Sequence, residues 1–253
     1  MANQTLTSAI QKEFEKSRRT YGAPRIHAAL VAGSVQCSRK RVARLMKSAG
    51  LVARRKARRK VTTNSKHELP VAPNVLDQQF IAERPDQKWL ADITYIATAE
   101  GWLYLAGVLD LYSRRIVGWA MDKTMGQELV IRALEMALVG RKPVAGLMHH
   151  SDRGSQYVAK GYQQRLRECG VTISMSRTAN CYDNSPMESF WSTLKMECAT
   201  EEFSSRIAAR QAIFEYIEIW YNRARCHSAL GYHNPAAFEQ LNSRALPLSI
   251  KLT

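Results

Sequence analysis

The 253-residue sequence lacks the features of membrane, secreted and disulfide-stabilised proteins. No uninterrupted apolar run approaches the roughly 18–20 residues that a membrane-spanning helix needs. The amino terminus has no apolar segment of the kind that a secretory signal contains. The five cysteines are odd in number and scattered, with no CxxC pair, so they predict reduced thiols and exclude a disulfide framework or a cysteine zinc site. We therefore expect a cytoplasmic protein.

Acidic residues are almost missing from the first quarter of the chain. Residues 1–66 contain 17 Lys and Arg but only Glu13 and Glu15, whereas the rest of the chain has 20 basic and 20 acidic residues. The formal net charge of +15 therefore lies in this segment. Clustered Lys and Arg bind polyanions because they neutralise phosphates and release counterions. A nucleic-acid partner is the favoured interpretation, and a basic, solvated surface is the alternative.

The basic segment has the pattern of three short helices. Apolar residues at four-residue steps predict a helix over 5–18, Pro24 opens a second, and Ser38 is the expected N-cap of a third that ends at Gly50. The expected core residues are Leu6, Ile10, Phe14, Ile26, Leu30, Val31, Val42, Leu45 and Met46. The other face of the third helix carries the DNA-binding candidates Arg39, Lys40, Arg41, Arg44 and Lys47. One-sided charge on a third helix favours a helix-turn-helix domain over residues 1–53.

A basic run follows this domain. Six of the seven residues from Arg54 to Lys60 are basic, and such a run does not pack into a core. A DNA-contacting arm and a solvated linker are both open interpretations. The charge then falls and prolines enter, which marks a domain boundary near residue 82. The arm and linker are assigned to residues 54–82, and the arm's DNA-binding candidates are Arg54, Arg55, Lys56, Arg58, Arg59 and Lys60.

The central part of the chain has an α/β pattern. Three apolar and β-branched runs, separated by Glu100-Gly101 and by residues 113–115, predict three antiparallel strands. The segments that follow predict, in order, a helix over 126–140, a strand over 144–152, a helix over 155–170, a strand over 171–176 and a helical region from Pro186. This order favours a mixed sheet flanked by helices.

Four acidic residues in this region are candidates for chemistry. Asp92 and Asp110 lie inside predicted strands, where a buried charge needs a partner or a metal, and a solvated strand face is the alternative. Asp152 ends a predicted strand, at an edge where sites collect, although Asp-Arg-Gly is also an ordinary turn sequence. Glu188 stands three residues after Ser185, in the spacing of a capping box, so a purely structural role is open for it.

Several phrases of the sequence resemble one family. They are TYGAPRIHAAL, WLADITYI, GWLYLAGVLDLYSRRIVGW, HHSDRGSQY, SMSRTANCYDNSPMESFWSTLKMEC and YNRARCHSALGYHNP. From about residue 5 to about residue 240, the chain resembles the downstream-frame transposase (OrfB) of the IS-three family of bacterial insertion sequences, whose catalytic core is similar to that of retroviral integrases. The resemblance implies a ribonuclease-H-like core over residues 83–200, with a five-stranded mixed sheet flanked by helices. A C-terminal helical extension is expected over residues 201–253.

The resemblance also implies the roles of four residues. Asp92, Asp152 and Glu188 are the implied catalytic carboxylates and metal ligands of a DDE transposase. Lys195 is the implied basic residue that follows the glutamate and contacts DNA. It lies about two helical turns after Glu188, on the same helix face. An exposed helix lysine is the alternative for this position.

Three carboxylates suit the chemistry of DNA cleavage and strand transfer. Two Mg²⁺ ions, or Mn²⁺ in their place, about 3.5–4 Å apart would assist in-line attack at phosphorus, first by water and then by a DNA 3′-hydroxyl. The expected activity is cleavage of element ends and strand transfer by direct transesterification. His149 and His150 are assigned structural or DNA-contacting roles, because at most one of two adjacent strand residues faces the site.

The resemblance implies several partners. They are double-stranded DNA of the terminal repeats and of the target, further copies of the chain assembled on DNA, and a helix-turn-helix protein from the upstream frame, separate or fused by frameshifting. The chain is expected to be the downstream product, which recognises element ends weakly when alone, and to act at the bacterial nucleoid. Two alternatives stay open: a catalytically inactive DNA-binding regulator or element remnant, and a ribonuclease-H-like repair nuclease.

Overall fold

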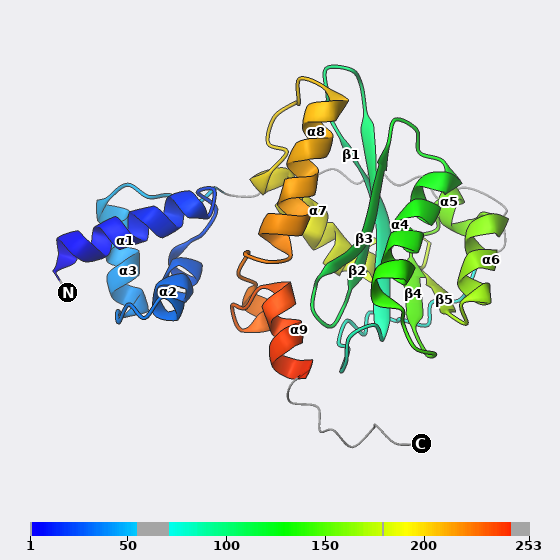
Figure 1. Cartoon of the computed structure of the whole chain (residues 1–253), viewed down its shortest axis with the longest axis horizontal. Coiled ribbons are helices and arrows are strands. Elements are labelled where there is room, and N and C mark those ends of the chain that lie inside the picture. The colour runs from blue at the N-terminus through cyan, green and yellow to red at the C-terminus, as the bar shows by residue number, and fades with distance from the viewer. Residues whose placement is uncertain (1, 55–70, 179, 244–253) are drawn as a thin grey trace.

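A computed structural model of the chain describes residues 2–54, 71–178 and 180–243. These residues form a small helical module, residues 2–54, beside a larger α/β core (Figure 1). No helix in these ranges combines the length and the apolar character that crossing a membrane requires. Five of the predicted arm residues lie outside the described residues, so the arm stays a prediction. They are Arg55, Lys56, Arg58, Arg59 and Lys60.

The helical module contains the three predicted helices, α1 (Asn3–Lys16), α2 (Ala23–Ala32) and α3 (Arg39–Ser48). The Ser38 side chain accepts the Arg41 backbone N–H as the expected N-cap, and Gly50 adopts the expected positive φ of 66° after α3. The predicted core residues are buried except Val31, which is 44% exposed. The prediction for Val31 was wrong because Ile26 and Leu30, one turn apart, already form the buried stripe of α2.

The core is built on the predicted five-stranded mixed sheet, with strand order β3-β2-β1-β4-β5. Strands β1 (Lys88–Ile96), β2 (Leu103–Asp110) and β3 (Ile116–Asp122) form an antiparallel meander. Strands β4 (Met148–Ser151) and β5 (Thr172–Met175) run parallel to β1. The two connections in the meander turn at Gly101 and Arg114, both with positive φ, as the turn signals predicted.

Three helices cover one face of the sheet: α4 (Gln127–Arg141), α5 (Ser155–Val158) and α6 (Lys160–Glu168). The single helix predicted over 155–170 was wrong, because Ala159 has extended backbone (φ −56°, ψ 135°) and divides α5 from α6. The break allows Tyr157 and Tyr162 to pack edge to face, with ring centroids 5.4 Å apart. Helix α4 approaches β3 closely at Gly118, where a Cβ would lie 2.2 Å from the Ala133 carbonyl oxygen.

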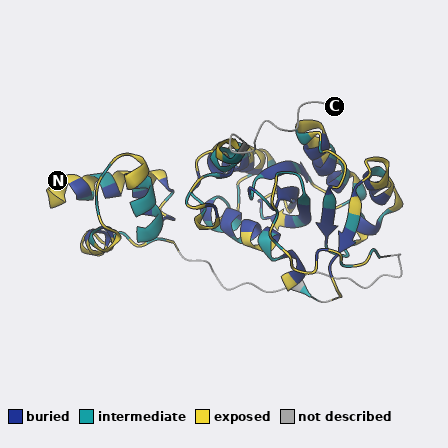
Figure 2. Ribbon diagram, turned by 90° about the horizontal axis from the view of Figure 1, so that it is seen from below, coloured by how far each residue is buried: buried dark blue, intermediate teal, exposed yellow. Residues whose placement is uncertain are grey.

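The other face is covered by α7 (Ser185–Glu197), α8 (Arg206–Phe214) and the π-helical turn η2 (Glu215–Tyr221) that continues α8. Figure 2 shows the buried residues concentrated in the sheet and on the helix sides that face it. The shorter elements of this part are the 3-10 turns η1 (Cys181–Asn184) and η3 (Ser228–Leu230) and the helix α9 (Pro235–Ser243). The aromatic residues Tyr216, Trp220 and Tyr221 of η2 pack into the core on this face.

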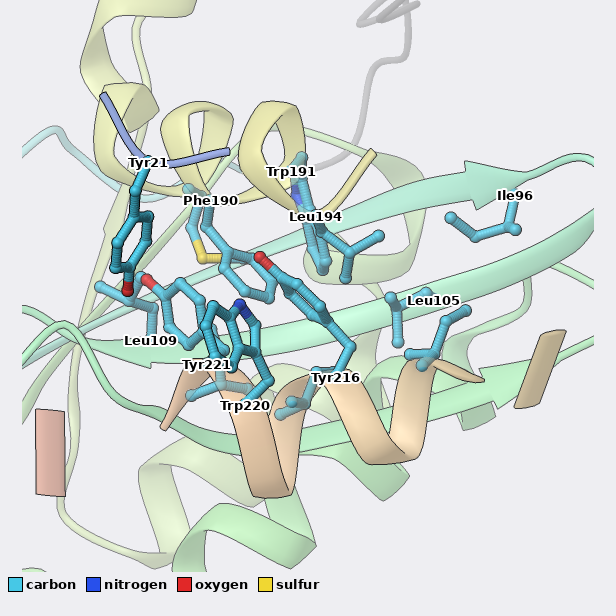
Figure 3. Close-up of a cluster of buried hydrophobic side chains, with 14 of the residues drawn as sticks. Tyr21, Ile96, Leu105, Leu109, Phe190, Trp191, Leu194, Tyr216, Trp220 and Tyr221 are labelled. Atoms are coloured by element: carbon cyan, nitrogen blue, oxygen red, sulfur yellow. The ribbon is translucent and has the colours of Figure 1, made fainter. Parts of the chain in front are cut away.

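The helical module contacts the core through the connection between α1 and α2. The ring of Tyr21 lies 6.0 Å from that of Trp220, and its hydroxyl accepts the Cys226 backbone N–H at 2.6 Å. Arg18 pairs with Glu215 at 3.0 Å. Figure 3 shows Tyr21 in the same apolar cluster as residues of α7 and η2. One side chain of the module thus belongs to the packing of the core.

Candidate active site

Asp92 lies on β1 with its side chain buried beneath α7. Its Oδ1 accepts the Ile93 backbone N–H at 2.8 Å, and its Oδ2 accepts the Trp191 Nε1–H at 2.9 Å. Trp191 reaches the carboxylate because Gly107 stands opposite Asp92 on β2, where a Cβ would lie 2.8 Å from the Trp191 ring. The prediction of a buried strand aspartate is confirmed, and the alternative of a solvated strand face is wrong.

The register of β1 and β4 brings Asp92 and Asp152 together. Ala91 pairs with Ser151, and these residues immediately precede the two aspartates. Parallel neighbours in register have their side chains on the same face, so Asp92 and Asp152 are adjacent at the carboxyl end of β4. Asp152 Oδ1 accepts the Gly154 backbone N–H at 2.8 Å. The first acidic pair of the predicted triad therefore follows from strand pairing.

Glu188 joins this pair from α7. Burial raises the pKa of Asp92 well above its usual value, and the negative charges of Asp152 and Glu188 raise that pKa further. Glu188 itself lies on the exposed side of α7. The charges of two carboxylates, from the end of β4 and from α7, thus act on Asp92 of β1.

The first turn of α7 is attached to β1 beside Asp92. Asn184 is the N-cap residue of α7, and its Nδ2 donates to the Ala91 carbonyl oxygen at 3.2 Å. The capping box with Ser185 as N-cap was wrong, since Ser185 is already helical and the actual N-cap makes no side-chain capping bond. The Asn184 side chain binds the neighbouring strand instead. This bond fixes the start of the helix that carries Glu188 relative to the strand that carries Asp92.

Asp183 anchors the segment that leads into α7. Its side chain is fully buried and accepts hydrogen bonds from the Arg177 guanidinium at 2.7 and 3.0 Å and from the Arg177 backbone N–H at 2.8 Å. Gln78 and Asn74 add two more bonds, at 2.9 and 3.0 Å. The bonds from Arg177 hold the pKa of Asp183 far below its usual value. This carboxylate is therefore neutralised within the fold, unlike that of Asp92.

Sequence reasoning missed Asp183, Asn184 and Trp191. All three stand in the phrase CYDNSPMESFW, close to Glu188. No break of periodicity or change of charge distinguishes them there. Their partners lie 99 residues away for Trp191 and 93 residues away for Asn184, so only the folded chain identifies them.

Asp110, the rival candidate, faces the opposite side of the sheet. It pairs with Trp89, three residues before Asp92 on β1, and Trp89 packs in the layer beneath α4. Its oxygens accept the Ser113 N–H and Oγ–H and the Asp86 N–H, which close the turn between β2 and β3. Burial raises the pKa of Asp110 to about 6. Its position and bonds describe a turn-stabilising residue.

The two histidines before Asp152 are fully buried and point to different layers. His150 bonds the Ser174 and Ser176 hydroxyls at 2.8 and 3.1 Å, and His149 bonds the Tyr162 hydroxyl at 2.9 Å. Burial lowers the pKa of His149 to about 3 and that of His150 to about 4, so both are neutral at pH 7. Their described partners are interior residues of the core.

Lys195 lies beside an exposed aromatic pair near the end of β1. Its Nζ is 4.3 Å from the centroid of the Tyr95 ring, which packs edge to face on Trp102 at 4.9 Å. Tyr95 and Trp102 are 38% and 49% exposed. A cation from α7 and two aromatic rings therefore stand together at the surface near the end of the strand that carries Asp92.

The DNA-binding candidates on α3 divide into two groups. Arg39, Lys40, Arg44 and Lys47 are exposed. Arg41 is half-buried, and its guanidinium donates to the Asn3 side chain at 2.9 and 3.2 Å, which ties α3 to α1. Arg54 is exposed after α3, with its backbone N–H bonded to the Arg19 carbonyl oxygen. The basic face of the third helix is thus available to a ligand, except for one residue with a partner inside the module.

The donor set of the acidic site fits hard divalent cations. Within the described ranges, no three His, Cys, Asp or Glu side chains stand close enough to enclose one metal ion as they are. Asp92 accepts its two hydrogen bonds from neutral donors, so these bonds orient the carboxylate without cancelling its charge. Carboxylate oxygens are preferred ligands of Mg²⁺ and Mn²⁺, and a cation between the carboxylates would relieve their mutual repulsion.

Three comparisons with known families and proteins agree with this geometry. Residues 82–181 and 169–235 match two families described as integrase core domains, and residues 1–60 match an HTH-like domain family. The chain is 49% identical over 240 residues to the "Insertion element IS600 uncharacterized 31 kDa protein" of Shigella sonnei, covering 94% of this chain and 88% of that protein. It is 44% identical over 238 residues to "Transposase InsF for insertion sequence IS3A" of Escherichia coli (strain K12), covering 93% of this chain and 82% of that protein.

A solved structure shares the fold. It is the cryo-EM structure of the simian T-cell lymphotropic virus intasome in complex with PP2A regulatory subunit B56 gamma. One of its chains matches with a TM-score of 0.56 at 14% identity, over 89% of this chain and 74% of that chain. At this identity the match extends to the fold alone, and it agrees with the expected integrase-like, ribonuclease-H-like core.

Proposed function

The chain belongs to the IS3 (IS-three) family of insertion-sequence transposases, which join an HTH-like domain to an integrase core, and from this premise we propose that Asp92, Asp152 and Glu188 are its catalytic carboxylates. As a DDE transposase it is a polynucleotidyl transferase that acts on DNA phosphodiesters. The observation that carries the proposal is the convergence of two like charges, those of Asp152 and Glu188, on buried Asp92 from separate elements. Perturbed carboxylates of this kind cluster at functional sites.

Divalent cations are the cofactor of this site, as two Mg²⁺ ions that Mn²⁺ can replace. The oxygens of Asp92, Asp152 and Glu188 would hold them. When bound, such a pair activates the attacking oxygen and stabilises the leaving oxygen of an in-line displacement at phosphorus. The protein's part is orientation: Trp191 and the Ile93 N–H fix the Asp92 carboxylate. The products would be cleaved element ends and then strands joined by direct transesterification.

DNA is the substrate, and its contacts come from two regions. On α3 the exposed Arg39, Lys40, Arg44 and Lys47 are suited to phosphates, whereas Arg41 acts chiefly through its bond to Asn3. Lys195 would contact DNA near the carboxylates, from its place beside Tyr95. The basic arm that begins at Arg54 would add phosphate contacts. The proposed ligands are double-stranded terminal repeats and target DNA.

The domain division predicted from the sequence is kept as part of the proposal: 1–53, 54–82, 83–200 and 201–253. The family matches over 1–60 and 82–181 support its first and third parts. The second half of the linker, residues 71–82, packs on the core, since Leu76 in this stretch is buried. The proposed assembly is a homo-oligomer on DNA at the bacterial nucleoid in the cytoplasm, with the upstream-frame helix-turn-helix protein separate or fused.

A strand-transfer assay with Glu188→Gln tests the proposed roles. Purified full-length protein is incubated with labelled element-end DNA and Mg²⁺ or Mn²⁺, and nicked and joined products are counted separately. Wild-type protein should give both products. Glu188→Gln should give neither while binding the same DNA equally well, because a neutral amide replaces an anionic ligand. Joining at near wild-type rate by the variant would return Glu188 to a structural role. Binding without any product from the wild-type protein would favour the inactive-regulator alternative.

A further inference from the structure

Helix α7 borders a second polar cavity, on a different side from Glu188. This cavity of about 250 Å³ lies between the helical module and the core. Its basic lining residues are Arg25 from α2, Arg114 from the β2–β3 turn, and Arg225 and His227, which follow η2. Ser189 and Thr193 of α7 supply hydroxyl groups at the wall. We call this cavity the arginine pocket.

Positive charge in the arginine pocket exceeds the negative charge around it. Arg225 is fully used by Glu197, to which its guanidinium donates at 2.8, 2.9 and 3.0 Å. Within the described ranges, Arg25 and Arg114 make no ion pair: Arg25 lies over the Tyr21 ring at 5.6 Å, and Arg114 donates to the Phe80 carbonyl oxygen at 3.3 Å. Two guanidinium groups at the cavity therefore keep hydrogen-bond donors for a further partner.

Electrostatics show that these groups converge. Burial and the charges of Arg225, Arg25 and Arg114 together lower the pKa of His227 to about 2. Burial and the charge of Arg225 also lower the pKa of Arg25. The Nε2 atom of His227 is buried, and no hydrogen-bond partner for it exists among the residues that the structure describes. The pocket thus combines uncompensated cations with an unsatisfied polar atom, which is the complement of a small anion.

We propose that the arginine pocket binds one phosphate group of the DNA backbone, next to the strand that the acidic site cuts. The identity of the anion as DNA rests on the proposed function. Guanidinium groups recognise phosphate oxygens with paired N–H donors, and the pocket is open beside exposed Ser228 and Ala229. Ser189 at its wall directly follows Glu188 on α7, so the two side chains point about 100° apart around the helix axis, and the bound phosphate would lie around α7 from the carboxylates.

The position of the pocket gives the bound phosphate a second effect. Arg25 belongs to the helical module, whereas Arg114 and Arg225 belong to the core. One phosphate held by Arg25 and Arg114 would add a contact between these parts to that of Tyr21. DNA binding would therefore strengthen the attachment of the module to the catalytic core.

The salt dependence of DNA binding tests the proposal. Full-length Arg25→Gln/Arg114→Gln is compared with wild type for binding of a labelled element-end duplex in EDTA, over a series of salt concentrations. Because both residues serve one phosphate, the slope of log K against log[salt] should become shallower by about 0.9, and affinity at low salt should fall about ten-fold. Arg25→Lys/Arg114→Lys should retain most of the slope. An unchanged slope in the Gln variant, or a change near twice this value, would overturn the single-phosphate proposal.

A charge-matched variant and a free-phosphate measurement separate a DNA site from a general charge effect and from other anions. Lys160→Gln/Arg167→Gln removes the same charge from exposed positions on α6 and should leave the slope unchanged. An equal loss of slope in this variant would indicate a general charge effect and overturn the proposal.

Inorganic phosphate at constant ionic strength should raise the Tm of wild type more than that of Arg25→Gln/Arg114→Gln. Stabilisation by phosphate with an unchanged DNA slope would identify a free anion, and no response in either assay would point to an acidic protein segment. Both results would contradict a DNA site.

The outcome is separable from that of the proposed function. EDTA excludes divalent metal chemistry, so the slope measures binding alone. If the Gln variant folds poorly, shown by a lowered Tm, Arg25→Gln and Arg114→Gln are measured separately, and each should weaken binding at low salt; unchanged affinity in both would overturn the proposal. Full activity in Glu188→Gln would refute the catalytic roles without altering the binding result, and an unchanged slope would refute the pocket without altering the catalytic roles.

Discussion

Buried carboxylates lie beside the two ends of α7 in opposite electrostatic situations. Near its carboxyl end, Glu197 accepts three N–H bonds from Arg225 and one each from Tyr216 and Trp220. Near its amino end, the helix brings Glu188 toward Asp92 and Asp152, and the donors to Asp92 are neutral. A buried carboxylate that is paired with a cation of the protein contributes to the structure. Several carboxylates close together lower stability, and they are typical of sites where a metal ion or a substrate neutralises them. The same helix therefore supports the fold at one end and carries a proposed catalytic carboxylate at the other.

The largest expected effect is the loss of activity in Asp92→Asn. The amide has the shape of the carboxylate but no charge to hold a cation, so nicking and joining should fall below detection, and Asp152→Asn should behave alike. The free energy of unfolding should change by only about 1 kcal/mol, because relief of repulsion offsets one lost hydrogen bond. A strand-transfer assay and urea unfolding measure the two quantities. Strand joining at near wild-type rate by Asp92→Asn would show that the carboxylates near the amino end of α7 are not needed for activity.

Removing the cation that pairs with Glu197 should lower the stability of the protein, in contrast to Asp92→Asn. Arg225→Met leaves Glu197 buried without its cation and should lower the free energy of unfolding by about 3–5 kcal/mol. Arg225→Met/Glu197→Gln should recover a large part of that loss, since no buried charge remains. Chemical denaturation of the two variants measures the difference. A loss below about 1 kcal/mol in the single variant would mean that the pair is less desolvated than its bonds indicate.

Two tryptophans provide a matched pair of variants, because Trp191 donates to Asp92 and Trp220 donates to Glu197. Trp191→Phe keeps an aromatic ring but removes the N–H that orients Asp92, so activity should fall about 10–100-fold with unchanged DNA affinity. Trp220→Phe removes an N–H from Glu197, which keeps its bonds to Arg225 and Tyr216. Activity should therefore persist in Trp220→Phe. Initial rates of nicking measure both variants, and equal losses would show that the N–H of Trp191 has no special role.

The smallest expected effect concerns Asp110, on the other face of the sheet. Its folded pKa of about 6 exceeds the ordinary 3.8, so its contribution to stability is complete below about pH 4 and is lost as the pH rises through 6. The loss is on the order of 1–3 kcal/mol at pH 7. In Asp110→Asn the free energy of unfolding should fall less between pH 4 and 6, and the variant should retain strand transfer. Denaturant unfolding across this pH range measures the free energy of unfolding. If this free energy fell equally with pH in wild type and in Asp110→Asn, other groups would be responsible for the fall.

Much of the fold was predictable because local patterns agreed with it. The capped third helix, the Glu100-Gly101 turn and the strand meander all follow from signals within a few residues, and the structure confirms them. The failures occurred where packing between distant residues decided the local conformation. Ala159 is extended so that Tyr157 and Tyr162 both pack against the core, and the nearby Gly161 lies inside α6 and not at the break.

The candidate site shows the same division. The three proposed carboxylates could be listed from strand positions and from resemblance to a family, but their supporting residues could not. Asn184 looked like the residue before a capping box, yet it bonds the Ala91 carbonyl oxygen on a distant strand. Arg41 looked like its basic neighbours on α3, yet it bonds Asn3. Polar side chains of the same type differ here only in their tertiary partners.

The sequence by itself determined the concentration of positive charge in the first 66 residues, the three helices there and the order of strands and helices in the core. These properties depend on composition and on periodicity over short distances. Only the tertiary structure shows that Asp92 lies on the face of α7 and Asp110 on the opposite face, because strand register fixes the face of each side chain. It alone brought Arg25 to Arg114 and Arg225, since contacts between residues far apart in the chain arise when buried layers pack and not from any local preference.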